Sequence, residues 1–510
     1  MKQLADISVL VLGLGESGLA MARWCAANGA RVRVWDSREP APHAAAVAEL
    51  GPAVTLLHGE LTDAAFEGVQ LVLKSPGLSP LDARIAAPLQ RAAQAGVAVQ
   101  GELDLFARAL ADLKVERGYA PKVIAITGTN GKTTTTAMAA LLIGRTGKRV
   151  AAAGNIGPTM LQTLADALAD DSLPDVWVLE LSSFQLDGVR HFEPDAAVVV
   201  NVTEDHLDWH GDMSAYVAAK ARVYGQNTVM VVNRDDAAVE RMVPAPVPGK
   251  GRFAKPVLRR VVRFGLDAPK HPGDYGLVVE NGMAWLVRAL EADETIKRPR
   301  KGSDDAIELH IQRLMPADAL RVRGRHNAAN ALAALALATA IDCPLAPMLH
   351  GLRDYTGEPH RVQFVTSIHG VDAFDDSKGT NVGATVAALN GLGDDRAPAR
   401  LVVILGGDGK GQDFTPLAAP VQRHARAVAT LGRDAAIIET ALADTGVAIQ
   451  RHATLEAATR WAFARAQPGD AVLLSPACAS LDMFRNYGHR AEVFVGEVQA
   501  LAAERGAVAA

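Results

Sequence analysis

The chain has 510 residues, enough for about two to four domains of roughly 100–200 residues each. Hydrophobic residues make up 49% and charged residues 21%, a balance that is ordinary for globular proteins and leaves ample material for a core. The formal net charge of -5 argues against nucleic-acid binding. The three cysteines lie far apart without CxxC spacing, which excludes a disulfide scaffold or a cysteine zinc site and fits a reducing cytoplasm.

The sequence shows no sign of secretion or membrane insertion. Near the N-terminus there is no long apolar signal region, and Ile7 to Leu12 predicts a first strand. The longest apolar helical stretch, Ala328 to Ile341, is too short to span a bilayer and carries Asn330. We therefore expect a soluble protein.

Strands rich in Val and Ile alternate with Ala-rich helical stretches almost throughout the chain. This alternation predicts the α/β fold class with mainly parallel sheets. The pattern restarts twice, which predicts three domains at 1–110, 111–357 and 358–510. The predicted strands are Ile7 to Leu12, Arg31 to Trp35, Val54 to Leu57, Leu71 to Leu73, Val97 to Val99, Val123 to Ile126, Val176 to Leu179, Ala196 to Val200, Val371 to Phe374, Leu401 to Leu405, Ala427 to Leu431, Val447 to Arg451 and Ala471 to Leu474.

The segment from Pro244 to Pro316 is the least regular part of the chain. It contains a recognisable strand, Tyr275 to Glu280, a basic run from Lys250 to Arg263, and a charged loop from Glu294 to Asp305. We interpret the segment as an elaborated sheet with surface insertions. The basic run fits a solvated loop or edge strand better than a binding patch.

A glycine motif opens the first domain. The sequence GLGESG, Gly13 to Gly18, follows the first strand and precedes a helix from Leu19 to Ala27, and Asp36 ends the second strand. A Gly-x-Gly-x-x-Gly turn with an acid at that place is the dinucleotide-binding fingerprint, but alone it is a weak signal. It predicts that a phosphate-bearing ligand approaches the backbone here, without specifying NAD.

The central domain opens with a second glycine turn, in KVIAITGTNGKTTTT, Lys122 to Thr136. A strand that feeds such a turn and then a helix presents backbone N–H groups and the positive end of a helix dipole to a phosphate. Lys132 would lie on the β and γ phosphates, and the Thr133 hydroxyl could hold Mg²⁺. Because Ile126 replaces the first glycine of GxxxxGK[ST], the loop is the shorter GxxGKTT.

Acidic and polar residues follow two later strands of the central domain. Glu180 ends the strand VWVLE, where a carboxylate beside a phosphate loop is placed to bind Mg²⁺; an ordinary strand-end carboxylate is the alternative. The sequence NVTEDHLDWH, Asn201 to His210, follows the strand AAVVV, and such clustered ionisable residues indicate a site in which His206 could ligate a metal. Lys220, in a helix predicted from Ser214 to Tyr224, has the pattern of an ordinary helical lysine.

The sequence RGRHNAAN, Arg323 to Asn330, opens a later helix in the central domain. Asn327 and Asn330 share one face of it, so they either contact a base or ribose or cap the helix.

Polar loops also follow three strands of the third domain. They are Asp375 to Asn381, Gly406 to Lys410 and Ser475 to Ser480. Ligands bind at the carboxyl ends of strands in open sheets. Arg361, Lys378 and Lys410 therefore make a plausible cationic clamp for a transferring phosphate and a carboxylate substrate, with solvated turn charges as the alternative.

Taken together, these motifs resemble the Mur ligase family. They run in order from Gly13 to Arg490 and cover nearly the whole chain: TGTNGKTTTT, LELSSFQL, NVTEDHLDWH with a later Lys220, RGRHNAANALAAL, EPHRVQ, DDSKGTN, LGGDGKGQDF and LSPACASLDMFRNYGHR. The central motifs are shared with all amide-forming Mur ligases and with folylpolyglutamate synthase. DSKGTN and SPACASLDMFRNYGHR are the discriminating ones, and they resemble the members that add D-glutamate.

The resemblance implies a Rossmann-like N-terminal domain, a central P-loop ATPase-type α/β domain and a C-terminal doubly wound Rossmann-like domain. It implies an ATP-dependent acid–amino-acid ligase that adds D-glutamate to UDP-N-acetylmuramoyl-L-alanine through an acyl phosphate, in the cytoplasmic part of peptidoglycan precursor synthesis. The implied cofactors are ATP and two Mg²⁺ ions. We expect a cytoplasmic monomer with small-molecule substrates and no nucleic-acid or membrane partner.

The resemblance also implies a role for individual positions. The implied ATP contacts are Gly128, Thr129, Asn130, Gly131, Lys132, Thr133, Thr134, Asn327, Asn330, Arg361 and Asp376. The implied contacts to the UDP-bearing substrate are Gly15, Glu16, Ser17, Ser37, Arg38, Ser75, Pro76, Gly77, Asn155, Ser182 and Gln185. The implied D-glutamate pocket comprises Lys378, Thr380, Lys410, Ser480 and Tyr487. The implied metal ligands are Thr133, Glu180, His206 and Lys220, the last as a carbamate. The implied catalytic residues are Lys132, Lys220, His206, Lys378 and Lys410.

The chain departs from the family pattern in two respects. Tyr487 stands where Phe is common, which adds a hydroxyl beside the amino-acid pocket. The chain is also longer than the usual member, mainly at 244–316 and at the loop Asp394 to Ala399.

Other functions compete with the ligase. An NAD-dependent oxidoreductase would explain the glycine motif and Asp36 but leaves the phosphate loop and the third domain without a role, and NADH binding tests it. A non-catalytic nucleotide-binding protein predicts binding or hydrolysis that does not depend on an amino acid. The sister ligases of the same family differ in the amino acid that they add.

Overall fold

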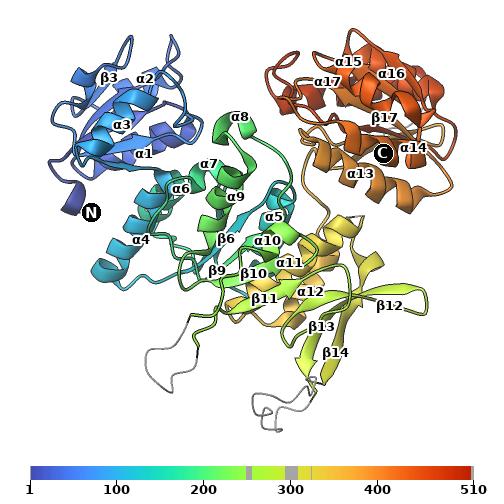
Figure 1. Ribbon diagram of the computed structural model, residues 1–510, viewed down its shortest axis with the longest axis horizontal. Helices are drawn as coiled ribbons and strands as arrows, with labels where there is room; N and C mark the ends of the chain where they lie inside the picture. Colours follow the sequence, from blue (N-terminus) through green and yellow to red (C-terminus); the bar gives the residue numbers. More distant parts are fainter. Residues whose placement is uncertain (1, 248–255, 293–307, 323, 507–510) are drawn as a thin grey trace.

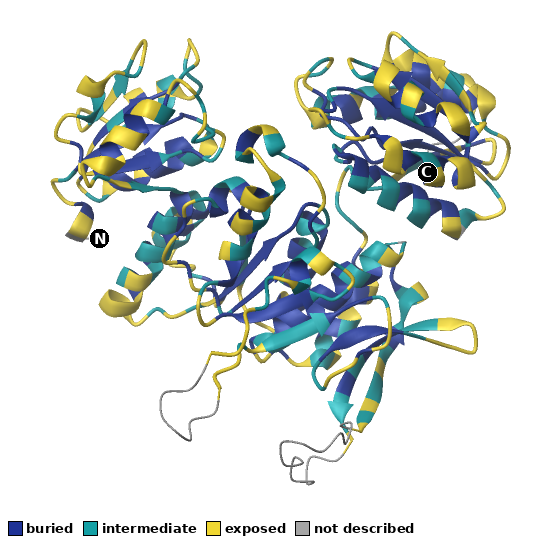
Figure 2. Cartoon of the chain, in the orientation of Figure 1, coloured by how far each residue is buried: buried dark blue, intermediate teal, exposed yellow. Residues whose placement is uncertain are grey.

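The computed structural model describes residues 2–247, 256–292, 308–322 and 324–506. The charged loop Glu294 to Asp305, the part of the basic run at 250–255, and Arg323 lie outside the described residues. The chain folds into three α/β domains, with the first and the third on opposite sides of the central one (Figure 1). Strands form the buried interior of each domain and helices present exposed faces to solvent (Figure 2).

The first domain is a parallel sheet in the order β3-β2-β1-β4-β5 with helices packed around it. Its strands are β1 (Ser8–Leu12), β2 (Arg31–Trp35), β3 (Val54–Leu57), β4 (Leu71–Lys74) and β5 (Ala98–Gln100). Its helices are α1 (Glu16–Ala27), α2 (Ala44–Ala48), α3 (Ala86–Gln94) and α4 (Glu102–Arg117), the last of which crosses the predicted boundary at residue 110.

The glycine motif serves the close approach of β1 to α1. Gly13 has φ +88°, and a Cβ there would lie 2.8 Å from the Cβ of Ser75. A Cβ on Gly18 would collide with the carbonyl oxygen of Gly13. Only glycine fits both positions, so α1 begins directly behind the strand-end loop that carries Ser75.

The central domain is a parallel sheet in the order β11-β10-β9-β6-β8-β7. Its strands are β6 (Lys122–Thr127), β7 (Val150–Gly154), β8 (Val176–Glu180), β9 (Ala196–Val199), β10 (Val229–Asn233) and β11 (Val261–Phe264). Its helices are α5 (Lys132–Gly144), α6 (Met160–Ala169), α7 (Ser183–Leu186), α8 (Leu207–His210), α9 (Met213–Ala221), α10 (Ala237–Glu240), α11 (Arg325–Ala340) and α12 (Leu345–Asp354).

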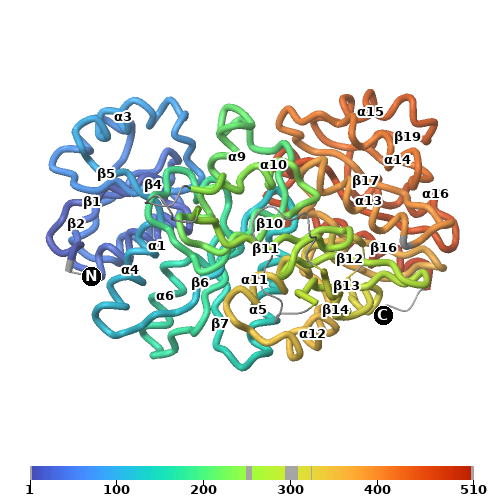
Figure 3. Tube along the Cα trace, turned by 60° about the horizontal axis from the view of Figure 1, so that its bottom comes forward, coloured from blue at the N-terminus to red at the C-terminus, as the bar shows by residue number. Residues whose placement is uncertain are grey.

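Helix α11 is apolar on nearly every side, a pattern that predicts a helix buried all round. It packs beside α5 and against the central sheet (Figure 3). This position brings Asn330 next to the loop that precedes α5. A small antiparallel sheet, β12 (Tyr275–Glu280), β13 (Met283–Glu291) and β14 (Leu309–Pro316), extends from the domain in the order β12-β13-β14.

The third domain is a mixed sheet in the order β15-β16-β20-β17-β18-β19, in which β15 pairs antiparallel with β16. Its strands are β15 (Gln363–Ile368), β16 (Val371–Asp375), β17 (Leu401–Gly406), β18 (Ala425–Leu431), β19 (Ala448–Arg451) and β20 (Ala471–Leu474). Its helices are α13 (Val382–Arg396), α14 (Ala418–His424), α15 (Ala435–Leu442), α16 (Leu455–Arg465) and α17 (Tyr487–Glu504).

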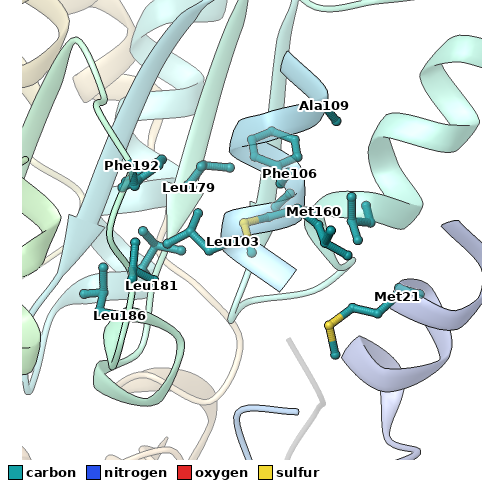
Figure 4. Packing of buried hydrophobic residues seen from close by; sticks show 14 of the residues in the cluster. Met21, Leu103, Phe106, Ala109, Met160, Leu179, Leu181, Leu186 and Phe192 are labelled. Atoms are coloured by element: carbon teal, nitrogen blue, oxygen red, sulfur yellow. The ribbon is translucent and has the colours of Figure 1, made fainter. Parts of the chain in front are cut away.

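The first and central domains share one apolar core. A single cluster of buried residues includes Met21 of α1, Phe106 of α4, Met160 of α6 and Leu179 of β8 (Figure 4). The buried clusters of the third domain contain residues of that domain alone among those described. Because polar interfaces permit relative domain motion more readily than apolar ones, the first domain is the firmly seated partner and the third the more easily displaced.

Most predicted elements are confirmed, several with the predicted bounds. The α/β fold class and the mainly parallel sheets are also confirmed. The predicted loop from Asp394 to Ala399 is wrong in its first half, because α13 continues to Arg396 and Asp394 forms an ion pair with Arg423 at 3.2 Å. Among the described residues, no helix has both the length and the apolar character needed to cross a membrane.

Candidate active site

The phosphate loop lies at the carboxyl end of β6 and leads into α5. Gly131 has φ +81°, and a Cβ there would lie 2.6 Å from Oδ1 of Asn330, so any other residue would be strained and would displace the Asn330 side chain. Asn201, which follows β9, accepts a hydrogen bond on Oδ1 from the backbone N–H of Asn130 at 2.8 Å. Its carbonyl oxygen accepts another from the N–H of Thr129 at 2.9 Å. The loop is therefore held by neighbouring elements and does not depend on a bound phosphate.

Lys132 is folded back over this loop. Its Nζ donates to the carbonyl oxygens of Gly128 and Thr129, both at 2.9 Å. Burial lowers the pKa of Lys132, and Glu180 offsets part of that effect. An anion placed on the loop would take over these hydrogen bonds and stabilise the charged form of the amine.

Lys220 is buried, with 1% of its surface exposed. Its Nζ donates to the carbonyl oxygen of Gly128 at 2.8 Å and lies 4.5 Å from the ring centroid of Tyr216. Burial, followed by the charge of Lys132, lowers the pKa of Lys220 well below its ordinary value. Such an amine loses its proton more readily than an exposed lysine, and the neutral form of an amine is the nucleophilic one.

Glu180 ends β8 next to the phosphate loop and is 1% exposed. Its Oε1 accepts a hydrogen bond from Nδ2 of Asn155 at 2.7 Å, whereas its Oε2 is buried and has no hydrogen-bond partner among the described residues. A buried carboxylate oxygen without a partner is costly in a protein interior unless a ligand or ion completes it.

The described residues contain no group of three or more His, Cys, Asp or Glu side chains arranged to hold a metal ion. The donors near the phosphate loop are of mixed type: the orphaned Oε2 of Glu180, the hydroxyl of Thr133 and the ring of His206. Carboxylate and hydroxyl oxygens fit Mg²⁺, which usually keeps several waters and binds through few protein ligands plus phosphates.

His206 begins α8 in a left-handed conformation, with φ +56°. Burial lowers the pKa of His206 to about 4; nearby Asp205 opposes the shift, and the charges of Lys410, Lys132 and Lys220 add to it. The ring is therefore neutral at pH 7 and can accept a proton or ligate a metal.

The third domain contacts the phosphate loop through polar side chains. Nη2 of Arg361 donates to Oγ1 of Thr133 at 2.9 Å, and Nζ of Lys378 lies 3.4 Å from the same oxygen. Asn130 and Asn381 exchange two amide hydrogen bonds, of 3.1 and 3.0 Å, and the side chain of Asn381 also caps α13. The structure thus brings two of the three predicted clamp residues directly onto the phosphate loop.

Two adjoining cavities lie between the central and third domains. A small one of about 80 Å³ is lined by most of the predicted ATP contacts: Asn130, Gly131, Thr134, Asn327, Asn330, Arg361 and Asp376. A larger one of about 810 Å³ shares Asn327 and Arg361 with it and adds Phe364 and Phe374. Asn330 donates to Oδ1 of Asn327 at 3.2 Å, which confirms that both share one helix face.

Asp376 is a buried carboxylate at the edge of these cavities. Its Oδ2 accepts from the hydroxyl of Ser475 at 2.6 Å, and its Oδ1 accepts from the backbone N–H of Val362 at 3.3 Å. Burial raises the pKa of Asp376 to about 7, although these hydrogen bonds and the charge of Arg361 lower it. The group therefore titrates near neutral pH.

The structure brings only some of the residues predicted to bind D-glutamate close together. Nζ of Lys378 lies 5.6 Å from the ring centroid of Tyr487, which is partly exposed. Thr380 follows Lys378 in the same loop and is half-buried, Lys410 is exposed with φ +52°, and Ser480 is buried. No side-chain hydrogen bond within the described residues links Ser480 to this group.

A cavity of about 550 Å³ lies between the first and central domains. It is lined by seven of the residues predicted to contact the UDP-bearing substrate: Glu16, Ser17, Pro76, Gly77, Asn155, Ser182 and Gln185. Gly15, Ser37 and Ser75 are not part of its wall. Arg38 instead forms a two-point ion pair with Asp36, at 2.8 and 2.9 Å.

This pairing bears on the oxidoreductase alternative. Asp36 also accepts a hydrogen bond from the backbone N–H of Leu14 at 2.6 Å. The acid that would bind a ribose in a dinucleotide site is therefore occupied in holding its own glycine loop and Arg38.

Several residues of the site were not singled out from the sequence. Tyr216 lies under Lys220 and shares a hydrogen bond with Oγ1 of Thr129 at 3.0 Å. Arg490 is buried and donates to the carbonyl oxygens of Ser377 and Cys478, so it braces two loops of the third domain. Arg23 lines the substrate cavity and donates to Oε1 of Gln162. Arg490 and Arg23 act through partners that are distant in sequence, whereas Tyr216 lies one helical turn before Lys220 on α9, a spacing that was readable from the sequence.

Sequence comparison places this arrangement among known proteins. The Mur ligase MurD-like N-terminal domain matches residues 7–101, the Mur ligase middle domain 126–338, and the Mur ligase glutamate ligase domain 360–478. A UDP-N-acetylmuramoylalanine–D-glutamate ligase of Albidiferax ferrireducens is 58% identical over 509 residues, which is 99% of either chain. The chain belongs to the Mur ligase family.

Solved structures of this family share the fold. A UDP-N-acetylmuramate–alanine ligase from Thermotoga maritima matches 97% of the chain and 100% of its own length, with a TM-score of 0.56 at 20% identity. A MurF ligase from Thermotoga maritima in complex with ADP matches 98% of the chain and 97% of its own length, with a TM-score of 0.56 at 17% identity. These matches agree with the three-domain architecture described above.

Proposed function

We propose that the protein is an ATP-dependent ligase that joins D-glutamate to UDP-N-acetylmuramoyl-L-alanine, a step of peptidoglycan precursor synthesis. The close relative that carries this activity in its name supports the proposal, because the identity extends over the whole chain. Three domains, with boundaries near 110 and 357, would bind the UDP-bearing substrate, ATP, and the amino acid with ATP. A cytoplasmic monomer remains the expectation from sequence.

The observation that carries this proposal is the convergence on Thr133. Arg361 and Lys378 of the third domain both reach the first hydroxyl of α5, directly beside Lys132 of the phosphate loop. A nucleotide-binding protein without a second substrate has no need for a separate domain that adds cations to the phosphate loop. A ligase does, because it must bring a carboxylate and an amine to the transferring phosphoryl group.

The chemistry follows from the substrates. A carboxylate is a poor acyl donor at neutral pH, so its oxygen first attacks the γ-phosphorus of ATP and the bond to ADP breaks. The amine of D-glutamate then attacks the carbonyl carbon of the acyl phosphate, loses a proton, and the C–O bond to phosphate breaks to leave the amide. Enzymes achieve such transfers mainly by positioning and by stabilising charge on the phosphoryl oxygens.

Lys132, Arg361 and Lys378 would stabilise that charge. Lys132 is free to exchange its loop carbonyls for phosphate oxygens, and Arg361 can grip two oxygens at once. Asn327 and Asn330 would contact the nucleoside, together with Asp376. Losing one such charge-stabilising donor typically costs on the order of 10²–10³ in rate.

The residues present also fit Mg²⁺. Oε2 of Glu180, the hydroxyl of Thr133 and the ring of His206 would hold it, with a carbamate on Lys220 for a second ion. The ions would neutralise charge on the phosphates during transfer.

The environment of Lys220 supports its carbamylation. The neutral amine attacks carbon dioxide, an N–C bond forms, one C–O π pair moves to oxygen, and a proton leaves the nitrogen. The remaining N–H can still donate to the carbonyl of Gly128, so the carbamate oxygens project away from that carbonyl. An anion at this position would also relieve the repulsion between Lys220 and Lys132.

The amino-acid end of the site would be formed by Lys378, Thr380, Lys410, Ser480 and Tyr487. The UDP-bearing substrate would occupy the 550 Å³ cavity between the first and central domains.

One assay tests the proposal against its rivals. ADP release is measured with ATP, Mg²⁺, UDP-N-acetylmuramoyl-L-alanine and a panel of amino acids. We expect release that requires D-glutamate. Release that depends on another amino acid would assign a sister ligase, and hydrolysis that ignores amino acids would refute the ligase proposal.

A further inference from the structure

The segment from Lys74 to Ser79, at the end of β4 in the first domain, touches the short helix α8 of the central domain, which follows His206. Oγ of Ser79 donates to the carbonyl oxygen of Trp209 in α8 at 3.0 Å. Nζ of Lys74 lies 5.1 Å from the centroid of the Trp209 ring. Lys74 also donates to the carbonyl oxygen of Leu78 at 2.8 Å, which closes the segment on itself. Two side chains of the first domain thus engage one tryptophan of the central domain.

From Trp209 a continuous aromatic cluster leads to the reaction centre. Trp209 stacks on Phe184 with ring centroids 4.7 Å apart and planes 28° apart. Phe184 meets the edge of His206 at 4.7 Å. His210 lies between Trp209 and Tyr216, with ring centroids 4.5 and 5.3 Å away, and Nζ of Lys220 lies over the Tyr216 ring. The cluster has Lys74 at one end and Lys220 at the other.

The helix that carries Trp209 has little stability of its own. It is a single turn, Leu207–His210, and an isolated turn is unfavourable because nucleation fixes several residues for few hydrogen bonds. It lies between His206 at φ +56° and Gly211 at φ +87°, both in the left-handed region. The position of α8, and with it of His206, therefore depends on contacts made by neighbouring elements.

Within the part of the chain that the structure describes, the indole of Trp209 has no hydrogen-bond partner. It is 7% exposed, and its Nε1 is buried without a partner. Its orientation rests on the stack with Phe184 and on the Lys74 amine over its face. Attraction between a cation and an indole ring is strongest when the cation is desolvated. Burial lowers the pKa of Lys74 to about 8, with Asp187 opposing the shift, so the amine is desolvated yet still cationic at pH 7.

We propose that Lys74 is a positioning residue of this enzyme. It clamps Trp209, together with Ser79, and so fixes α8 and His206 relative to the domain that carries the UDP-bearing substrate. The reaction centre is then set correctly only when the first domain is seated on the central one. The assignment of His206 as a metal ligand and of the UDP-bearing substrate rests on the proposed function. The clamp of Lys74 and Ser79 on Trp209 rests on the contacts described above.

The first arm of the test does not require activity. Amide hydrogen exchange is followed by mass spectrometry for the peptide covering 206–211 in the full-length protein. Lys74→Met keeps the length and packing of the side chain and removes its charge. Lys114→Met, an exposed lysine on α4 of the same part of the chain, is the matched control. We expect faster exchange in Lys74→Met only, and unchanged exchange in both variants would overturn the clamp.

The second arm uses D-glutamate-dependent ADP release. Lys74→Met should lower kcat by between about 2-fold and 30-fold, the range from exposed to desolvated cation–ring contacts, and raise the Mg²⁺ concentration for half-maximal activity. The KM for ATP should change less than twofold. Lys74→Arg should recover most of the activity, since a guanidinium also stacks on indole. A kcat and Mg²⁺ requirement within twofold of wild type would refute the proposal.

A double-mutant cycle completes the test. If Lys74 acts through Trp209, the pair Lys74→Met and Trp209→Leu should be no slower than the slower single variant. Multiplied effects would show that the two residues act independently and would overturn the proposal. If wild type shows no D-glutamate-dependent release, the proposed function fails while the exchange experiment still decides the clamp.

Discussion

Lys220 offers the most decisive perturbation of this site. An ordinary lysine is less than about 1% neutral at pH 8, whereas burial beside Lys132 lowers the pKa of Lys220 well below its usual value. The neutral amine can take up carbon dioxide. Lys220→Ala removes this chemistry and should lower the rate by on the order of 10²–10³, as expected for losing one charge-stabilising group in an active site.

The same substitution should leave the fold intact. The substitution removes three methylenes, and burial of each is worth about 0.8 kcal/mol, so packing loses about 2.4 kcal/mol. Against this stands the buried amine, which satisfies only part of its hydrogen-bonding capacity through Gly128, and whose removal regains about 1–3 kcal/mol. The net loss in the free energy of unfolding should be no more than about 2 kcal/mol, which thermal or urea unfolding measures.

Chemical rescue separates a carbamate from other roles of Lys220. Lys220→Ala leaves space for a small carboxylate, so acetate or formate should restore part of the activity in a saturable way. Lys220→Met fills the same space and should be equally slow but not rescued. Rescue of both variants, or activity of Lys220→Ala within tenfold of wild type without added carboxylate, would refute the carbamate.

Three further perturbations test separate parts of the site. Lys132→Met should lower the rate of ADP release by on the order of 10³. The free energy of unfolding should stay the same or rise slightly, because the substitution removes a buried charge. Near-normal turnover would contradict the phosphate-loop assignment. Asp376 has a folded pKa of about 7 against an ordinary 3.8, so the folded protein binds the extra proton, and its stability contribution should be lost as pH rises from about 4 through 7. Asp376→Asn should flatten this part of the pH–stability curve of the ligand-free protein. If the free energy of unfolding differed between variant and wild type by the same amount at every pH, the pKa of Asp376 would not be raised. Arg23→Met should raise the KM for the UDP-bearing substrate by about 10-fold to 100-fold, the strength of a hydrogen bond to a charged group, and weaken inhibition by UDP more than by uridine; Arg31→Met, on the same domain, serves as the control and should match wild type.

The sequence predicted the parts of the site whose signal is local. The phosphate loop, Glu180 and the polar loops of the third domain each follow an apolar strand, and parallel strands carry such loops to one edge of a sheet. That edge is where the structure places them. The pairing of Asn327 with Asn330 was likewise readable from helical spacing alone.

Lys220 shows where local signals end. From spacing it is an ordinary helical lysine, because its burial depends on Tyr216 beneath it and on Gly128 more than ninety positions away. Only the family resemblance drew attention to it. The contacts of Lys74 with Trp209 and of Asn130 with Asn381 were unpredictable for the same reason: both join different domains, and nothing in either segment specifies its partner.

The charges of the site explain why it needs its ligands. Lys132, Lys220, Lys378 and Arg361 crowd around one loop, and burial and mutual repulsion lower the pKa of all three lysines. Among the described ionisable groups that offset this, Glu180 acts on Lys132 and Lys378. A bound triphosphate would supply the missing negative charge, and the proposed carbamate on Lys220 would turn one repelling group into an attracting one.

The excess of positive charge around the phosphate loop also affects the motion of the third domain. The third domain meets the central one through Arg361, Lys378 and Asn381, and shares no apolar core with it among the described residues. Two of these three contacts bring cations toward Lys132. Without an anion they oppose closure, and with ATP in place they favour it. Under the proposed function, the nucleotide would therefore provide much of the free energy that holds the third domain against the central one, and we expect phosphoryl transfer to begin only after the third domain has closed.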